Sequence, residues 1–182
     1  AKEMMVLAAA LTIQDPRERP AEVRGTADEM HARFTDDKSD FSSFLLLWQY
    51  INERQAELSS SQLRKMCHRE FINFLRIREW QDLFAQLREM GRTANIRVSN
   101  GRDIDASGRE VEIHKSLLSG LLSHVGAKEE RAKAYGKAPR GPREYLGARG
   151  TKFAIFPGSG LFKQNPDWVL SAELVETSRL WA

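Results

Sequence analysis

TKFAIFPGSGLFKQNPDWVLSAELVETSRLW, residues 151–181, is the stretch that decides the fold of this 182-residue chain. Its two apolar runs, Lys152–Phe156 and Trp168–Val175, are predicted to be β-strands. The loop between them holds residues that interrupt strands through their backbone preferences, namely Pro157, Gly158, Gly160, Asn165 and Pro166. In the second run an alternating set of side chains shares one face, which predicts a half-buried strand with Trp168 in the core; this set is Trp168, Leu170, Ala172 and Leu174.

The residues before this stretch are unusually basic. Residues 128–152 contain eight Lys or Arg and three Glu, whereas the whole chain has a net charge of only +3. Such a segment attracts phosphate backbones through a salt-dependent term that does not depend on base sequence. A solvated linker is an equally good interpretation, since Gly136, Pro139, Gly141 and Pro142 accumulate here.

Further towards the N-terminus the pattern becomes helical. Helices are predicted over 4–14, 40–57 and 111–125, with a short helical piece at 28–34. Helix 40–57 is expected to be the most buried. Another helical stretch starts at a Ser59–Gln62 capping box and is expected to break near 73–76. Gly126 is predicted to end helix 111–125, and residues 91–108 to form a loop.

These elements predict a mainly α-helical bundle, residues 1–127, followed by a small antiparallel β-domain, residues 128–182. The chain starts and stops in apolar sequence, so both ends are expected to be cut. The second domain is too short for a complete five-stranded barrel, and we expect strands to be missing from it. An unpaired strand edge is then expected to favour association.

The same stretch resembles a known family. An apolar strand, a Pro-x-Ser turn, Leu-Phe, a Pro-x-Trp-Val step and Glu-Leu-Val-x-Thr follow the order found in the oligonucleotide-binding (OB) fold that closes DEAH-box RNA helicases. The resemblance continues through Ile113–Gly126, Cys67–Met90, Ser39–Tyr50 and Ala8–Pro20, which are similar to the helicase-associated "ratchet" helices. HARF at 31–34 and REWQDL at 78–83 look closest to the bacterial HrpA subfamily.

The resemblance implies an accessory RNA-binding region of an ATP-dependent helicase that moves 3′ to 5′ along single-stranded RNA. The helical domain is expected to form a wall of the RNA channel, and the OB domain to guide RNA entry. ATP and Mg²⁺ would bind motor lobes elsewhere in the parent chain. Those lobes are expected partners, as is a ribonucleoprotein.

Candidate RNA contacts combine the basic segment with the glycine-rich turn. In the related helicases this turn reads roughly His-Pro-Ser-Ser; here Phe156 and Gly158 replace the His and the first Ser, so the resemblance carries a contact only to Ser159. Aromatic rings interleaved with cations suit single strands, since bases stack while cations follow phosphates. Tyr145, Phe153 and Phe162 could stack, although Tyr145, Phe153 and Trp168 also suit a barrel core. The predicted RNA-binding residues are Lys137, Arg140, Arg143, Arg149, Lys152, Ser159 and Lys163.

Other chemistry is poorly represented. No G-x-x-x-x-G-K-[ST] phosphate loop occurs, so this chain alone is not expected to hydrolyse ATP. The four His and single Cys have no metal-ligand spacing, and Cys67, on an apolar helical stripe, is expected in the core. No metal or cofactor is therefore expected here, and no residue pattern supports an independent enzyme.

The sequence contains no apolar run long enough to span a bilayer and no signal peptide, so a cytoplasmic location without membrane contact is expected. The alternative function is a protein-docking module that binds the motor lobes or a ribonucleoprotein, with little RNA affinity of its own. Salt dependence separates the two, because apolar docking does not weaken steeply as salt rises.

Overall fold

The computed structural model describes residues 1–98, 104, 108–130, 142–177 and 179–182. The chain divides into two compact units. Residues 1–36 and 41–113 make the helical unit, and residues 37–40 and 114–182 make the β unit. The predicted domains, 1–127 and 128–182, remain a prediction; the first strand begins at Val125, before the expected boundary.

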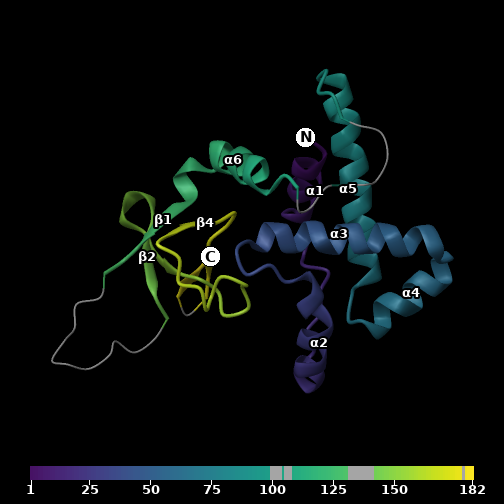
Figure 1. Cartoon of the computed structure of the whole chain (residues 1–182), viewed down its shortest axis with the longest axis horizontal. Helices are drawn as coiled ribbons and strands as arrows, with labels where there is room; N and C mark the ends of the chain where they lie inside the picture. Colours follow the sequence, from purple (N-terminus) through teal and green to yellow (C-terminus); the bar gives the residue numbers. More distant parts are fainter. Residues whose placement is uncertain (99–103, 105–107, 131–141, 178) are drawn as a thin grey trace. The chain divides into compact units, whose positions relative to one another are not determined.

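The helical unit follows the predicted order of helices, with some different ends (Figure 1). Its helices are α1 (Lys2–Ala10), α2 (Arg24–His31), α3 (Asp40–Glu57), α4 (Ser60–Arg69) and α5 (Phe74–Thr93), and α6 (Glu110–Gly120) leads into the β unit. Short 3₁₀ turns cover Ala21–Val23 and Ala32–Phe34. Helix α1 ends earlier than predicted because a turn follows it, in which the Thr12 hydroxyl donates to the Ala9 carbonyl at 2.8 Å.

Trp80 is the centre of the helical core. Its indole N–H donates to the Val6 carbonyl of α1 at 2.9 Å, and its ring packs edge-on against Trp48 of α3 at 5.0 Å. Figure 1 shows α1 and α3 both meeting α5. Helix α3 contributes Leu45, Leu47 and Ile51 to the core, but it is not the most buried helix as predicted. Six of the nine residues of α1 are buried, compared with six of the eighteen of α3.

The expected break between the fourth and fifth helices is confirmed. Phe71 adopts a left-handed φ of 54°, and the Asn73 side chain caps α5 by accepting from the Leu75 and Arg76 amides at 3.0 and 3.1 Å. The predicted Ser59–Gln62 capping box is also present. The loop expected from residue 91 starts later, because α5 continues to Thr93; a Cβ on Gly91 would lie 2.5 Å from the Met5 methyl group. The turns predicted at 100–101 and 107–108 lie largely outside the described residues.

Polar groups inside the helical unit gather on Glu70. Its carboxylate accepts from the Tyr50 hydroxyl at 2.9 Å and pairs with Arg33. Its carbonyl accepts from the buried His31 ring, whose Nε2 lies 3.0 Å away. Cys67, one turn earlier, is fully buried as expected, and burial raises the pKa of its thiol to about 11.

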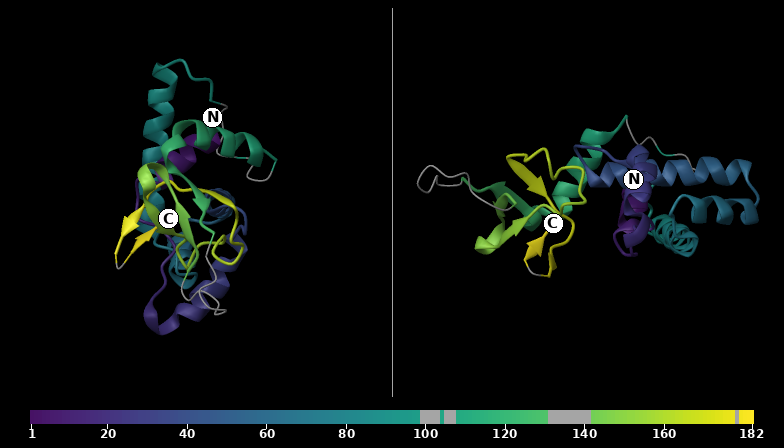
Figure 2. Two further views of the ribbon diagram at one scale, coloured as in Figure 1. Left: turned by 90° about the vertical axis from the view of Figure 1, so that its left-hand side faces the viewer. Right: turned by 90° about the horizontal axis from the view of Figure 1, so that it is seen from below.

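The described residues of the β unit form one six-stranded sheet in the order β4-β1-β2-β3-β6-β5. The strands are β1 (Val125–Lys128), β2 (Glu144–Leu146), β3 (Lys152–Ala154), β4 (Trp168–Leu170), β5 (Val175–Glu176) and β6 (Leu180–Trp181). Figure 2 shows β5 and β6 as a C-terminal hairpin in yellow. These strands have only two to four residues each, which allows six of them to fit into this short unit. The expectation that strands are missing stays a prediction.

The pairing differs from a purely antiparallel sheet in one place. Four of the five strand pairs are antiparallel, whereas β3 and β6 are parallel at Ala154 and Trp181. The predicted strand 168–175 is divided into β4 and β5. Within the described sheet, β4 and β5 each pair with one neighbour only and form the two edges, so the barrel is open.

The core of the β unit lies on the other face of β4 from the one predicted. Val169 and Ser171 are buried, whereas 68% of the Trp168 surface is exposed. Residues 168–170 are all apolar, so alternation could not decide which face is buried. The hydroxyl of buried Ser171 donates to the His124 carbonyl at 3.4 Å, and the Ser171 amide donates to the same carbonyl at 3.0 Å.

The prediction that Gly126 ends a helix is wrong, because Gly126 lies inside β1. Helix α6 ends at Gly120, and a 3₁₀ turn over Leu122–His124 leads directly into the strand. A Cβ on Gly126 would lie 2.4 Å from the Phe153 ring and 3.3 Å from the Tyr145 Cβ. The absence of a side chain therefore lets β1 lie against the aromatic core. None of the helices in the described ranges is long and apolar enough to cross a membrane.

Gly126→Ala is expected to destabilise the β unit by about 1–3 kcal/mol, because Phe153 and Tyr145 are packed in the core and cannot move aside freely. The matched control is Gly120→Ala, where a Cβ would meet nothing within 4 Å, and its effect is expected to stay within about 1 kcal/mol. Hydrogen exchange of β1 and β3 peptides during urea titration measures both. Equal protection in the two variants would contradict this packing argument.

The stability of the helical unit is expected to fall below neutral pH through His31. Burial lowers the pKa of His31 below its ordinary value of 6.5, so below about pH 6.5 the unfolded chain takes up a proton before the folded one does. Stability is therefore complete above that pH and decreases as pH falls towards the folded-state pKa. Urea titrations at pH 7.5 and about pH 5, followed by far-UV circular dichroism, measure the difference.

His31→Gln should reduce this pH dependence, since no titratable group remains at the buried position. His68→Gln is the matched control, because His68 is exposed and should not change it. If the two variants have the same pH dependence as the unsubstituted chain, another group is responsible.

Candidate nucleic-acid interface

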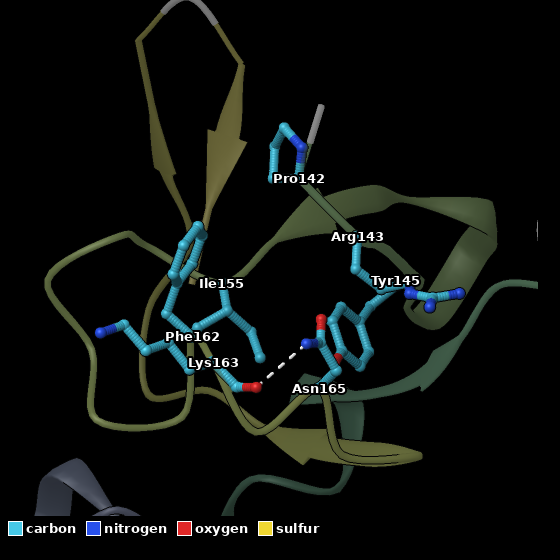
Figure 3. Close-up of a pocket in the computed structure, with 7 residues that line it drawn as sticks. All are labelled: Pro142, Arg143, Tyr145, Ile155, Phe162, Lys163 and Asn165. Carbon is cyan, nitrogen blue, oxygen red and sulfur yellow. Dashed lines mark hydrogen bonds between the residues drawn. The ribbon is translucent and has the colours of Figure 1, made fainter. Parts of the chain in front are cut away.

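A pocket of about 380 Å³ opens on the β unit (Figure 3). It lies between the start of β2, the end of β3 and the loop that leads to β4. Its lining residues are Pro142, Arg143, Tyr145, Ile155, Phe162, Lys163 and Asn165. Two of the seven predicted RNA-binding residues, Arg143 and Lys163, are thus brought to one place although 20 positions separate them in the sequence.

The floor of the pocket is the aromatic core. Tyr145 is fully buried and stacks on Phe153, with ring centroids 5.9 Å apart, and Ile155 is only 6% exposed. Burial raises the pKa of Tyr145, while the Arg143 guanidinium opposes that shift. The Tyr145 hydroxyl donates to the Pro166 carbonyl at 2.9 Å, so the core holds the 156–167 loop from beneath.

Asn165 shapes the rim. It adopts a left-handed φ of 48°, a conformation that asparagine tolerates better than most residues, and its side-chain N–H donates to the Lys163 carbonyl at 3.1 Å. Its own carbonyl accepts from the Lys128 ammonium at 3.3 Å. At the other end of the loop, the Gly160 amide donates to Asp40 at 3.0 Å. The rim is therefore preformed.

Two cations flank this rim. In Figure 3 the charged ends of Arg143 and Lys163 lie on opposite sides of the pocket, and neither points into it. Within the described part of the chain, neither side chain forms an ion pair. Both charges are therefore available to an external anion.

The other predicted contacts are placed differently. Lys152 pairs with Glu129 at 2.8 Å, which raises the pKa of its ammonium, and Arg149 sits at φ 57° in the 3₁₀ turn Ala148–Gly150. The Ser159 hydroxyl accepts from the Leu161 amide at 3.1 Å, a turn-forming role. None of the three lines the pocket. Lys137 and Arg140 lie outside the described residues.

Several of the pocket residues were not among the predicted contacts. Ile155, Asn165 and Pro142 line the pocket, yet Asn165 and Pro142 were noticed only as turn residues. Of the candidate stacking rings, Tyr145 and Phe153 are buried, and Phe162 remains half-buried at the pocket wall. The Asn165-Pro166 turn dipeptide, which starts two residues after Lys163, is the sequence signal that could have indicated the pocket rim.

Ion pairs reduce the basic excess of this region. Lys128 pairs with Asp167, and this interaction lowers the pKa of the Asp167 carboxyl group. With Lys152 paired to Glu129, two cations of the basic segment already have partners. Among the described residues, no group of three His, Cys, Asp or Glu side chains is arranged to hold a metal ion. The arrangement can bind an extended anionic ligand with an apolar or aromatic part.

Comparison with known proteins agrees with this geometry. Residues 113–182 match the oligonucleotide/oligosaccharide-binding (OB)-fold family. This match and the curled six-stranded sheet confirm the predicted OB-type fold of the β unit.

The chain as a whole is similar to part of much longer proteins. It is 49% identical over 179 residues to the ATP-dependent RNA helicase HrpA homolog of Haemophilus influenzae, and 47% identical over 180 residues to the ATP-dependent RNA helicase HrpA of Escherichia coli. These alignments cover 98% and 99% of this chain but 13% of each relative. The pre-mRNA-splicing factor ATP-dependent RNA helicase prp22 of Schizosaccharomyces pombe is 26% identical, over 98% of this chain and 14% of its own length.

Proposed function

We propose that this chain is the accessory RNA-binding region of an ATP-dependent RNA helicase, because residues 113–182 match the OB-fold family and almost the whole chain is similar to a part of two HrpA helicases. In this role the β unit holds single-stranded RNA beside the motor lobes. The lobes bind ATP and Mg²⁺, and the helicase moves from 3′ to 5′ along the RNA strand. A cytoplasmic location is part of the same proposal.

The observation that carries this proposal is the pair of cations at the pocket. Arg143 and Lys163 come from different parts of the β unit and flank one pocket (Figure 3). Neither forms an ion pair with any residue that the structure describes. A single-stranded nucleic acid presents a phosphate on each side of every base. Cations on both sides of a pocket match that spacing of charge and apolar surface.

The helical unit has a supporting part in the proposal. Similarity to the HrpA proteins extends over almost the whole chain, so the helices come with the OB unit as one module. We propose that they form the ratchet-like wall of the RNA channel and contact the motor lobes. Leu75 and Met90 of α5 are 73% and 66% exposed, and we propose them as side chains that contact those lobes.

The full 182-residue chain is expected to bind single-stranded RNA with an affinity that falls as salt rises. Arg143→Ala combined with Lys163→Ala should make the slope of log K against log salt shallower by about 1.4, since each phosphate contact on a single strand contributes about 0.7. Fluorescence anisotropy with a labelled RNA of about 15 nucleotides, within the range of OB-fold site sizes, measures the slope.

Lys152→Ala is the matched control, because it removes the same charge from a lysine already paired with Glu129. Its slope should equal that of the unsubstituted chain. If the decrease in slope per removed positive charge is the same for Lys152→Ala as for the double variant, the pocket cations contribute no more to RNA binding than other cations do. Absence of RNA binding even at low salt would overturn the proposed function and favour the docking module, whose partner would be the motor lobes or a ribonucleoprotein.

A further inference from the structure

The pocket on the β unit differs in kind from a phosphate site. Its interior is built from Tyr145, Ile155 and Phe162, whereas the charged ends of Arg143 and Lys163 lie outside it (Figure 3). An anion placed inside would lose its hydration without gaining a charged partner. A flat, weakly polar group is the chemistry that fits the interior.

Phe162 supplies a suitable surface for such a group. It packs against the core formed by Tyr145, Phe153, Ile155 and Val169, yet remains half-buried at the pocket wall. One part of the ring is thus fixed by the core while another part is open to a ligand. A ring held in this way can stack on a planar ligand with little loss of side-chain freedom.

Asn165 supplies the polar contact. One amide N–H is already used by the Lys163 carbonyl at 3.1 Å, which orients the side chain and leaves its Oδ1 as an acceptor at the rim. Every RNA base has an N–H donor on its Watson–Crick edge, which pairing in a duplex conceals. An acceptor at this position therefore recognises that a base is unpaired, without selecting its identity.

The size of the pocket limits the number of bases. A volume of about 380 Å³ is near the lower end of the range of about 300–1,000 Å³ that is typical of small-molecule pockets. It suits one base with its ribose. The two hydrogen bonds that hold the loop, from Tyr145 to the Pro166 carbonyl and from Lys128 to the Asn165 carbonyl, keep the space open before ligand arrives.

We propose that this pocket takes one unstacked base of single-stranded RNA, with Phe162 stacking on the base, Asn165 accepting from its Watson–Crick edge, and Arg143 and Lys163 contacting the phosphates on either side. The inference rests on the proposed RNA-binding function and adds a subsite to it. The β unit then senses that RNA is single-stranded through base extrusion, in addition to attracting its charge.

The test is an abasic scan of five-nucleotide single strands, in which each base in turn is removed and the phosphates are kept. Binding of the full 182-residue chain is measured by competition against a labelled strand at fixed salt. One position should lose affinity by roughly 5- to 100-fold, the range expected for one base–aromatic stack, and the other positions much less. A duplex of the same sequence should compete poorly.

Two variants connect the effect to the pocket. Phe162→Leu keeps apolar packing against the core but removes the flat ring, and Asn165→Gly removes the amide while tolerating the left-handed φ of 48°. Both should weaken binding of the intact strand and make the abasic scan flat. Phe156→Ala is the matched control, since Phe156 is exposed on the same unit and does not line the pocket; its scan should be unchanged.

The outcomes separate the two proposals. If the chain binds RNA with the expected salt dependence, but the abasic scan is flat or Phe162→Leu behaves like Phe156→Ala, the base subsite is overturned and the proposed function stands. If no single strand binds at all, both are overturned. A single sensitive position that disappears in Phe162→Leu supports the subsite.

Discussion

The hydrogen bond from the Tyr145 hydroxyl to the Pro166 carbonyl joins the aromatic core of the β unit to the loop that lines its pocket. Tyr145 belongs to the sheet and to the aromatic core, whereas Pro166 belongs to the loop that brings Lys163 and Asn165 to the pocket. A buried hydroxyl must find a partner, and here the partner is a loop carbonyl 21 residues away. Satisfying one buried polar group thus sets the position of the loop, and the pocket follows from that position.

The elements that could be predicted from the sequence are those with strong local signals. The Ser59–Gln62 capping box, the break before α5 and helix α3 all follow from side chains within a few residues of each other, and the family order of residues 151–181 correctly indicated an OB fold. Gly126 and Trp168 were misjudged for a common reason. Gly126 is explained by Phe153 on another strand, and the buried face of β4 by the packing of Val169 in the core with Tyr145 and Phe153. Neither is decided by local sequence. Long-range contacts decided both.

The residue types of the candidate site could be predicted from the sequence, but only some of its residues could. Basic composition predicted a phosphate-binding region, and this stays a prediction; counting charges could not show which cations are already paired. Lys128 and Lys152 neutralise Asp167 and Glu129, and these pairs organise the strands and loops instead of facing a ligand. Arg143 and Lys163 form no ion pair with the described residues, because the fold places none of the carboxylates of those residues beside them. Ile155 lines the pocket because it directly follows β3, and no spacing in the sequence indicates that this position lies near Lys163.

The open sheet ends in two very short edge strands, β4 with three residues and β5 with two. A strand of this length offers only one or two backbone groups to an incoming chain, and the right-handed twist of a sheet turns such a small edge quickly out of register with a longer partner. The brevity that leaves the barrel open therefore also protects it. The sheet can therefore keep an unclosed side while offering little backbone on which copies of itself could pair.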